Sequence, residues 1–265
     1  MKLIIGNGEI GSALYAHLRK FGETQYTSRN GVGVHLDLGE KWILPPCETA
    51  YICSGKTKTK ECEDDPEGTR FINVIQTVKL ANELVERGTR VIFISSERVF
   101  NGLVPFRKVN DPYSPTTEYG RQKVEAELAL RGVTVIRFGK VLGWDVPLFE
   151  GWIEDLLDGR PIYPFSDVGM APVSLEFAVE MLRRVEGLAG THQISGDRDL
   201  SYDRIAFYIA NNMGADLSLV RPVKSVPHPF TTLESDLPDL IGVNVPDSWN
   251  TIEEWCHNRV LDRAR

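Results

Sequence analysis

The sequence predicts an α/β protein built on a doubly wound parallel sheet. Short apolar runs of strand length alternate with helical stretches through the first half of the chain. A Gly-x-Gly-x-x-Gly pattern follows the first of these runs directly. Small and polar residues stand just after several later runs, at the edge where the strands of a parallel sheet end and ligands bind.

The composition is that of a globular protein with a large core. The chain has 265 residues, of which 42% are apolar and 25% charged. A net charge of -7 with interspersed signs argues against a nucleic-acid partner and against an anionic membrane surface. No apolar run reaches the roughly 20 residues of a membrane span, and a strand begins at once, so we expect a cytoplasmic protein without a signal peptide. The four cysteines and five histidines form no cluster, which favours reduced thiols and no metal site.

The first strand, residues 3–5, leads into a glycine loop and a helix expected over residues 12–21. Strand, glycine loop and helix together are typical of a dinucleotide site, because glycines allow the backbone to approach a pyrophosphate at the positive end of the helix. The loop supplies six candidate cofactor-binding residues: Gly6, Asn7, Gly8, Glu9, Ile10 and Gly11.

The second strand, residues 24–28, ends without the acidic residue that binds the ribose diol of NAD. Ser28 and Arg29 stand there instead, and a hydroxyl with a guanidinium suits a 2′-phosphate. NADP(H) is therefore the preferred cofactor, with NAD(H) the alternative. A short strand over residues 35–38 follows, and Asp37 is placed to reach the adenine edge.

The third buried strand, residues 50–53, delivers Cys53, Ser54 and Gly55 to the same sheet edge as further cofactor-binding candidates. A long helix is expected over residues 67–87. Its apolar face is predicted to hold Phe71, Val74, Ile75, Val78, Ala81 and Val85, with Asn73 away from that face.

The strand over residues 90–94 brings Ser96 to the edge, where a serine hydroxyl can polarise a carbonyl. After a Pro- and Asn-rich turn, Tyr119 and Lys123 lie four residues apart on a predicted helix and therefore share one face. A nearby ammonium favours the phenolate and lowers the pKa of a tyrosine, so the pair can exchange a proton with an alcohol or carbonyl oxygen.

Beyond the strand over residues 134–138 the regular alternation of strands and helices weakens. Helices are predicted within residues 147–159, 175–185, 201–213 and 251–265, and short strands at 192–194 and 219–221. Lys140, Arg160 and Arg221 are candidates for binding the substrate by their location alone.

These residues together resemble the extended short-chain dehydrogenase/reductases, and most closely their dTDP-4-dehydrorhamnose reductase branch. The resemblance runs over most of the first two hundred residues, in the order that the family shows. It is carried by the stretches 6–11, 94–102, 115–123 and 192–196, together with Asn73, Glu127 and Arg137.

The resemblance implies a Rossmann-type domain over residues 1–143 and about 172–198, with a small α/β substrate domain from about 144–171 and 199–265. It also implies Tyr119 as general acid, Lys123 as the residue that binds the nicotinamide ribose and lowers the tyrosine pKa, and Ser96 as their hydroxyl partner. Glu97 is a further substrate-contact candidate. The expected activity is the NADPH-dependent reduction of a keto-sugar nucleotide of the 4-keto-6-deoxysugar type.

Two other functions stay open. A sugar-nucleotide 4-epimerase that retains NAD needs no residue that this sequence lacks, whereas a dehydratase needs a second acid where Arg98 stands. The other alternative is a non-catalytic, NADP-binding regulatory subunit, a role that the β subunit of methionine adenosyltransferase takes in this branch. The expected partner is a small-molecule substrate, a nucleotide sugar; a homodimer is compatible with the sequence.

Overall fold

The computed structural model describes residues 1–225 and 230–263. Seven parallel strands form the central sheet in the order β10-β6-β5-β4-β1-β2-β3. They are β1 (Lys2–Ile5), β2 (Thr24–Ser28), β3 (Val34–His35), β4 (Thr49–Ile52), β5 (Arg90–Ser96), β6 (Val133–Phe138) and β10 (Thr191–Ile194). The strand order reverses between β1 and β4, and a crevice at such a reversal is where ligands bind in open α/β sheets. The predicted α/β fold is confirmed.

Alternate strand residues pack against two different helical layers, as the pleat requires. Leu3 and Ile5 face a core that includes α4 (Thr77–Glu86) and α5 (Glu118–Ala129), whereas Ile4 faces α1 (Glu9–Leu18) and α7 (Leu175–Arg184). Both faces of the sheet are covered, which explains why its strands read as continuous apolar runs.

The long helix expected over residues 67–87 is interrupted, and part of its predicted apolar face is wrong. α3 (Pro66–Arg70) passes into a π-helical segment, η1 (Phe71–Gln76), before α4 begins. Phe71 and Ile75 are 43% and 44% exposed, while Leu80 and Leu84 are buried. A π-helical turn contains more residues than an α-helical turn, so the face that a regular period predicts rotates away from the sheet.

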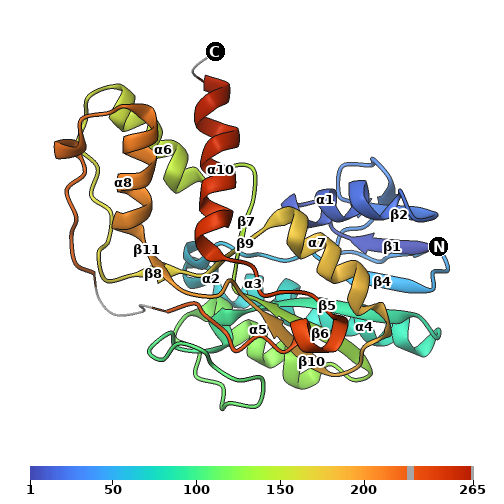
Figure 1. Cartoon of the computed structure of the whole chain (residues 1–265). Coiled ribbons are helices and arrows are strands. Elements are labelled where there is room, and N and C mark those ends of the chain that lie inside the picture. Colours follow the sequence, from blue (N-terminus) through green and yellow to red (C-terminus); the bar gives the residue numbers. More distant parts are fainter. Residues whose placement is uncertain (226–229, 264–265) are drawn as a thin grey trace.

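A second apolar core lies to one side of the sheet, between α6 (Pro147–Leu157), α8 (Tyr202–Met213) and α10 (Ser248–Arg263). Figure 1 shows these three helices gathered apart from the sheet. Two small strand pairs connect this region with the rest: β7 (Lys140–Leu142) with β9 (Pro172–Ser174), and β8 (Gly169–Met170) with β11 (Leu200–Ser201). The division into two domains with the predicted boundaries stays a proposal.

The remaining elements are short. They are α2 (Thr59–Asp64), η2 (Glu97–Val99), η3 (Val185–Gly187), η4 (Leu217–Leu219) and α9 (Leu237–Ile241).

Several predicted boundaries need correction. The first helix starts at Glu9 rather than at residue 12, directly on the glycine loop. The strand expected over 35–38 is confined to Val34–His35, although Leu36 and Leu38 are buried. The strand expected over 219–221 is absent from the described residues, because a 3-10 turn ends at Leu219 and only a single bridge joins Val220 to Ile162. The terminal helix is described to Arg263, so the last two residues of that prediction lie outside the described residues.

Candidate active site

The glycine loop makes a tight turn at the end of β1. Gly6 has a positive φ of 102°, and its N–H donates to Thr27 Oγ1 at 2.9 Å. A Cβ on Gly11 would overlap the carbonyl oxygen of Gly6, whereas a Cβ on Gly8 would meet open space. The loop is therefore closed on the protein side and open at Gly8, the side from which a phosphate would approach the start of α1.

Above this loop lies a cavity of about 310 Å³, the cofactor pocket, into which most of the predicted cofactor residues converge. It is lined among others by Gly6, Asn7, Gly8, Ser28, Arg29, Asp37, Cys53, Ser54 and Gly55. Arg29 has no carboxylate partner among the described residues, whereas the Ser28 hydroxyl donates to the carbonyl of Val32 at 2.6 Å. The Ser54 hydroxyl is buried without a partner in the described part of the chain. The Ser54 hydroxyl, the Arg29 guanidinium and the open space beside Gly8 are therefore suited to binding the phosphates of a dinucleotide.

Two of the six predicted loop residues, Glu9 and Ile10, have side chains that point away from the cofactor pocket. Ile10 lines a second pocket, which contains Tyr119. Glu9 extends toward Gly143, because a Cβ at that position would overlap the Glu9 carboxylate.

Asn73 is a positioning residue whose role the sequence did not reveal. From the π-helical segment its side-chain oxygen accepts from Lys56 N at 2.7 Å, and its nitrogen donates to Lys56 O at 2.9 Å. The same nitrogen donates to Gln122 Oε1 at 2.7 Å. Asn73 therefore connects the loop after β4 with α5, the helix that carries Tyr119 and Lys123.

The second pocket, the sheet-edge pocket, has a volume of about 350 Å³ and brings Ser96, Glu97, Tyr119, Lys123 and Lys140 together. Cys53 and Ser54 line both this pocket and the cofactor pocket, so the two are adjacent. The side chain of Thr117 caps α5 by accepting from Gly120 N at 3.1 Å, which fixes the turn that holds Tyr119.

The pKa of Tyr119 shifts in the opposite direction from the sequence expectation. Burial and the nearby Glu97 carboxylate raise the pKa of this phenol, outweighing Arg98 and a hydrogen bond from Ser96, which lower it. Lys123 is almost fully buried and donates to the carbonyl of Ile94 at 2.8 Å. Burial lowers the pKa of Lys123 itself to about 8, against a smaller opposing effect of Glu127. The predicted lowering of the Tyr119 pKa is therefore wrong for the protein without ligand, since desolvation exceeds the attraction of nearby cations.

Ser96, Glu97 and Arg98 form a chain of contacts at the end of β5. Ser96 Oγ donates to Glu97 Oε2 at 2.5 Å and accepts from Arg98 N at 3.2 Å. Glu97 Oε1 lies 3.2 Å from Arg98 Nε. The Ser96 hydroxyl is thus oriented in advance by its neighbours.

A later part of the chain approaches Glu97 through Asp199, which no sequence pattern identified. Its carboxylate accepts from Thr231 N at 2.7 Å and from Thr232 N at 3.2 Å. Burial raises the Asp199 pKa, and the charge of Glu97 adds to this shift. The signal was missing because these contacts join segments that are far apart in the sequence.

Behind the sheet-edge pocket, Arg137 and Glu127 form a buried ion pair. Arg137 Nη2 lies 2.7 Å from Glu127 Oε2, and their side chains are 2% and 1% exposed. Two hydroxyl groups also donate to the Glu127 carboxylate: Ser95 Oγ at 2.5 Å and Tyr113 Oη at 2.9 Å. Glu127 follows Lys123 by one turn of α5, so this network anchors α5 to β5 and β6.

The three cationic residues predicted to bind the substrate lie in different parts of the structure. Lys140 lines the sheet-edge pocket, whereas Arg160 pairs with Asp155 and Asp158 near the end of α6. Arg221 is exposed and lines neither of the two pockets. The structure therefore brings only Lys140 to the other candidates.

In the described part of the chain no group of three or more His, Cys, Asp or Glu side chains is arranged to hold a metal ion. Among the helices of residues 1–225 and 230–263, none is both long and apolar enough to cross a membrane.

The sequence model of the RmlD substrate binding domain matches residues 1–235, and the chain belongs to this family. The chain is 24% identical over 199 residues to methionine adenosyltransferase 2 subunit beta of Bos taurus, covering 66% of this chain and 57% of that relative. It is 26% identical over 181 residues to the probable low-salt glycan biosynthesis reductase Agl14 of Haloferax volcanii, covering 63% and 60%. The chain thus spans less than two thirds of the length of these relatives.

A solved structure, the dTDP-4-dehydrorhamnose reductase of Bacillus anthracis in complex with NADP, superposes with a TM-score of 0.84 over 97% of this chain and 98% of that one, at 17% identity. At this identity the likeness shows the fold. Together with the family match it confirms the resemblance to the RmlD-like, extended short-chain dehydrogenase/reductases.

Proposed function

We propose that this protein is an NADPH-dependent reductase of a keto-sugar nucleotide, of the 4-keto-6-deoxysugar type, with Tyr119 as the proton donor. The convergence of Tyr119, Lys123 and Ser96 in one pocket next to the glycine loop is the observation that carries the proposal. The family match supports the reductase class. A neighbour that binds NADP and a relative named as a glycan-biosynthesis reductase support the cofactor and the type of substrate.

NADPH, when bound, supplies a hydride to the carbonyl carbon. The residues that would hold it are the glycine loop at its pyrophosphate, Arg29 at its 2′-phosphate and Lys123 at its nicotinamide ribose. Arg29 is exposed and without a carboxylate partner among the described residues, which favours a phosphate and therefore NADP over NAD.

Tyr119 gives its phenolic proton to the carbonyl oxygen, and the substrate becomes an alcohol. Its raised pKa keeps the phenol protonated at neutral pH, which is the state that a proton donor needs. The Ser96 hydroxyl, oriented by Glu97 and Arg98, can turn to hold the same oxygen. After the transfer the Lys123 ammonium stabilises the phenolate until a proton returns.

Related reactions on the same scaffold fit less well. A dehydratase needs an acid or base where Arg98 stands, and a guanidinium does not deprotonate in proteins. A 4-epimerase retains its NAD, whereas Arg29 favours the exchangeable NADPH.

A non-catalytic regulatory subunit is the second candidate, and one observation favours it. The relatives include methionine adenosyltransferase 2 subunit beta, at 24% identity over 199 residues. The complete set of Tyr119, Lys123 and Ser96 in one pocket favours catalysis over this role.

The deciding experiment measures NADPH oxidation with dTDP-4-dehydrorhamnose and a panel of other keto-sugar nucleotides. Tyr119→Phe should lower kcat by about 10²- to 10⁴-fold, the usual contribution of a general acid, and should leave NADPH binding intact. Tyr163→Phe is the matched control, because Tyr163 is 56% exposed and lines neither of the two pockets. Full turnover by Tyr119→Phe would refute the proton-donor assignment. No turnover with any substrate, together with co-purification of an adenosyltransferase, would favour the regulatory role.

A further inference from the structure

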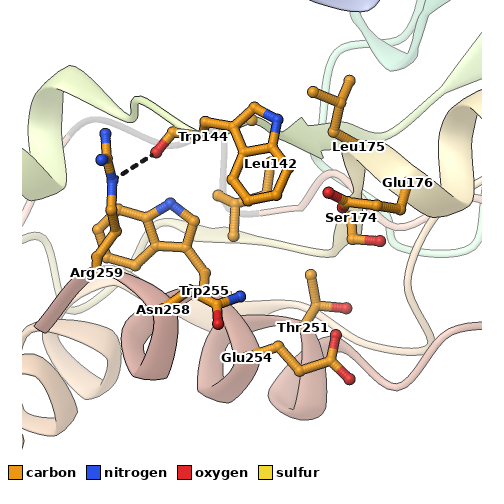
Figure 2. A pocket seen from close by; sticks show the side chains of 11 residues that line it. Leu142, Trp144, Ser174, Leu175, Glu176, Thr251, Glu254, Trp255, Asn258 and Arg259 are labelled. Atoms are coloured by element: carbon orange, nitrogen blue, oxygen red, sulfur yellow. Dashed lines mark hydrogen bonds between the residues drawn. The ribbon is translucent and has the colours of Figure 1, made fainter. Parts of the chain in front are cut away.

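A separate cavity of about 400 Å³, the α10 cavity, lies outside both pockets described above. Three segments form it: the end of β7 with Gly143 and Trp144, the start of α7, and one face of α10. Figure 2 shows Trp144 and Leu175 along one side, with Thr251 and Glu254 of α10 opposite them. Its volume falls in the range of about 300–1,000 Å³ that is typical of small-molecule sites.

Two tryptophans give this cavity an aromatic wall. Trp144 is 56% exposed, an unusual state for the largest apolar side chain, and its carbonyl accepts from Arg259 Nε at 2.9 Å. Arg259 is held in turn by Asp145 and Glu150. The backbone that carries the exposed indole is therefore fixed, and the indole is a preformed flat surface.

The second tryptophan supplies a hydrogen-bond donor that none of the described residues uses. Trp255 is only 7% exposed and packs against Phe149, with ring centroids 5.1 Å apart. Its indole N–H has no acceptor among the described residues. Buried polar groups in native proteins usually have partners, so this unpartnered N–H points to an acceptor on a ligand.

The polar side chains of the cavity that remain free for a ligand are mainly acceptors, because Arg259 is held by Asp145 and Glu150 and the Thr251 hydroxyl donates to the carbonyl of Asp247. Glu176 and Glu254 line it, and neither carboxylate has a hydrogen bond or a cation partner among the described residues. Asn258 adds an amide that offers both a donor and an acceptor. A ligand must therefore bring several donors, at least one acceptor and an apolar face.

A pyranose ring meets all of these conditions. Its hydroxyl groups donate to carboxylates and accept from an indole N–H, while its C–H face can lie on an aromatic ring. An anion would be repelled by the two glutamates, because the one cation among the described residues of the lining, Arg259, is already paired with Asp145 and Glu150. We propose that the α10 cavity is a saccharide-binding site that holds one glycosyl unit, with Trp144 as the stacking surface and Glu176, Glu254 and Trp255 as the hydrogen-bonding groups.

The cavity has a continuation, which indicates that the saccharide is longer than one ring. A second hollow of about 310 Å³ shares Trp144, Leu175 and Glu176 with it and extends along α1 to His17 and Lys20. A neighbouring glycosyl unit would lie there, on the other side of Trp144. This site is independent of the proposed reductase reaction, since none of its lining residues lines the cofactor pocket or the sheet-edge pocket.

The test is a titration of the whole protein, without cofactor, with D-glucose, N-acetylglucosamine and maltotriose, followed by tryptophan fluorescence and calorimetry. Saturable binding is expected, with maltotriose tighter than glucose if the second hollow holds another ring. Trp144→Ala and Glu254→Gln should each weaken binding by about tenfold or more, the loss of one stacking surface or one charge-assisted hydrogen bond.

Two matched variants control for general effects. Tyr163→Ala removes an aromatic ring that is also 56% exposed but lies outside the α10 cavity, and Glu253→Gln changes the adjacent residue of the same helix, which does not line it. Both should bind as the wild type does. The proposal is overturned by absence of saturable binding of any saccharide, by binding that Trp144→Ala and Glu254→Gln leave unchanged, or by binding of spermidine alone, which would make the site one for organic cations. Because no turnover is measured, failure here leaves the reductase proposal untouched.

Discussion

The sheet-edge pocket and the α10 cavity are similar in size and opposite in construction. Around the first, polar side chains bond to other groups of the protein: Ser96 to Glu97, Lys123 to the backbone carbonyl of Ile94, and Arg137 to Glu127 behind them. In the second, Glu176 and Glu254 have no partner among the described residues. The first is a preorganised site whose parts depend on each other, and the second is a surface that keeps its bonding capacity for a ligand.

This difference has an energetic consequence. Removing one member of a buried, bonded network leaves its partner desolvated and unpaired, which costs more than the bond itself contributed. Removing an exposed, unpaired charge leaves nothing behind. Substitutions in the two cavities should therefore separate by several kcal/mol in stability, even where the chemical change is similar.

The largest expected effect comes from breaking the buried pair. Arg137→Met should lower the free energy of unfolding by about 3–5 kcal/mol, because the carboxylate of Glu127 would remain buried without its cation. Urea denaturation measures this change. Arg121→Met is the control: Arg121 pairs with Glu118 on the exposed side of α5, and such pairs are worth about 0–1 kcal/mol. Equal losses in the two variants would contradict the view that burial makes this network expensive to break.

The next largest effect is expected on cofactor binding, at Arg29. Arg29→Ser should weaken NADPH binding by about 10- to 100-fold, the loss of a charge-assisted contact to a phosphate, and leave NADH binding nearly unchanged. Fluorescence titration with both cofactors measures the ratio. A parallel loss for NADH would mean that Arg29 supports the loop and does not read the phosphate.

The pH dependence of the proposed reaction should follow Lys123. Its pKa is lowered by burial to about 8 from the usual 10.5, so the ammonium is present below pH 8 and lost above it. Because the Tyr119 pKa is raised, the tyrosine keeps its proton through this range. We expect kcat/KM to fall by up to about tenfold per pH unit above pH 8.

The lowered pKa of Lys123 also affects stability: kcat/KM should fall with rising pH, whereas the free energy of unfolding should rise. Between about pH 8 and 10.5 the unfolded chain binds the Lys123 proton and the folded chain does not, so this residue makes the free energy of unfolding rise with pH. Lys123→Met should remove that rise. An alkaline decline of kcat/KM that persists unchanged in Lys123→Arg, whose guanidinium stays charged, would assign the decline to another group.

The smallest effect is expected in the α10 cavity. The double change Glu176→Gln and Glu254→Gln should alter the free energy of unfolding by less than about 1 kcal/mol, because Glu254 is exposed without a described partner and Glu176 interacts, among the described residues, only with the start of α7. Thermal unfolding with and without maltotriose measures it. A large loss of stability without ligand would show that these carboxylates have a structural task, and the contrast between the two cavities would disappear.

Much of the sheet-edge pocket could be predicted from local sequence. Strand runs that end in small or polar residues located Ser54 and Ser96, and helical spacing placed Tyr119 beside Lys123. These predictions rest on the periods of strand and helix, which the chain expresses within a few residues.

What the sequence did not reveal depends on tertiary structure. The pKa of Tyr119 is set by burial and by Glu97, and the contact of Asp199 with Thr231 joins distant segments. The α10 cavity combines residues from three separated stretches, none of which carries a motif. The roles of the candidate site residues themselves remain predictions for the variants above to test.

The π-helical segment Phe71–Gln76 has a consequence for how this chain is compared with others. Such a turn is an α-helix that carries one additional residue, and here it holds Asn73, which reaches both Lys56 and Gln122. A relative with an uninterrupted helix would align correctly on one side of this segment and be offset by one position on the other. An alignment without a gap would then match Leu80 and Leu84 to outward-facing residues. Deleting one residue here should restore a regular helix, whereas the same deletion within α4 would rotate its buried face away from the sheet.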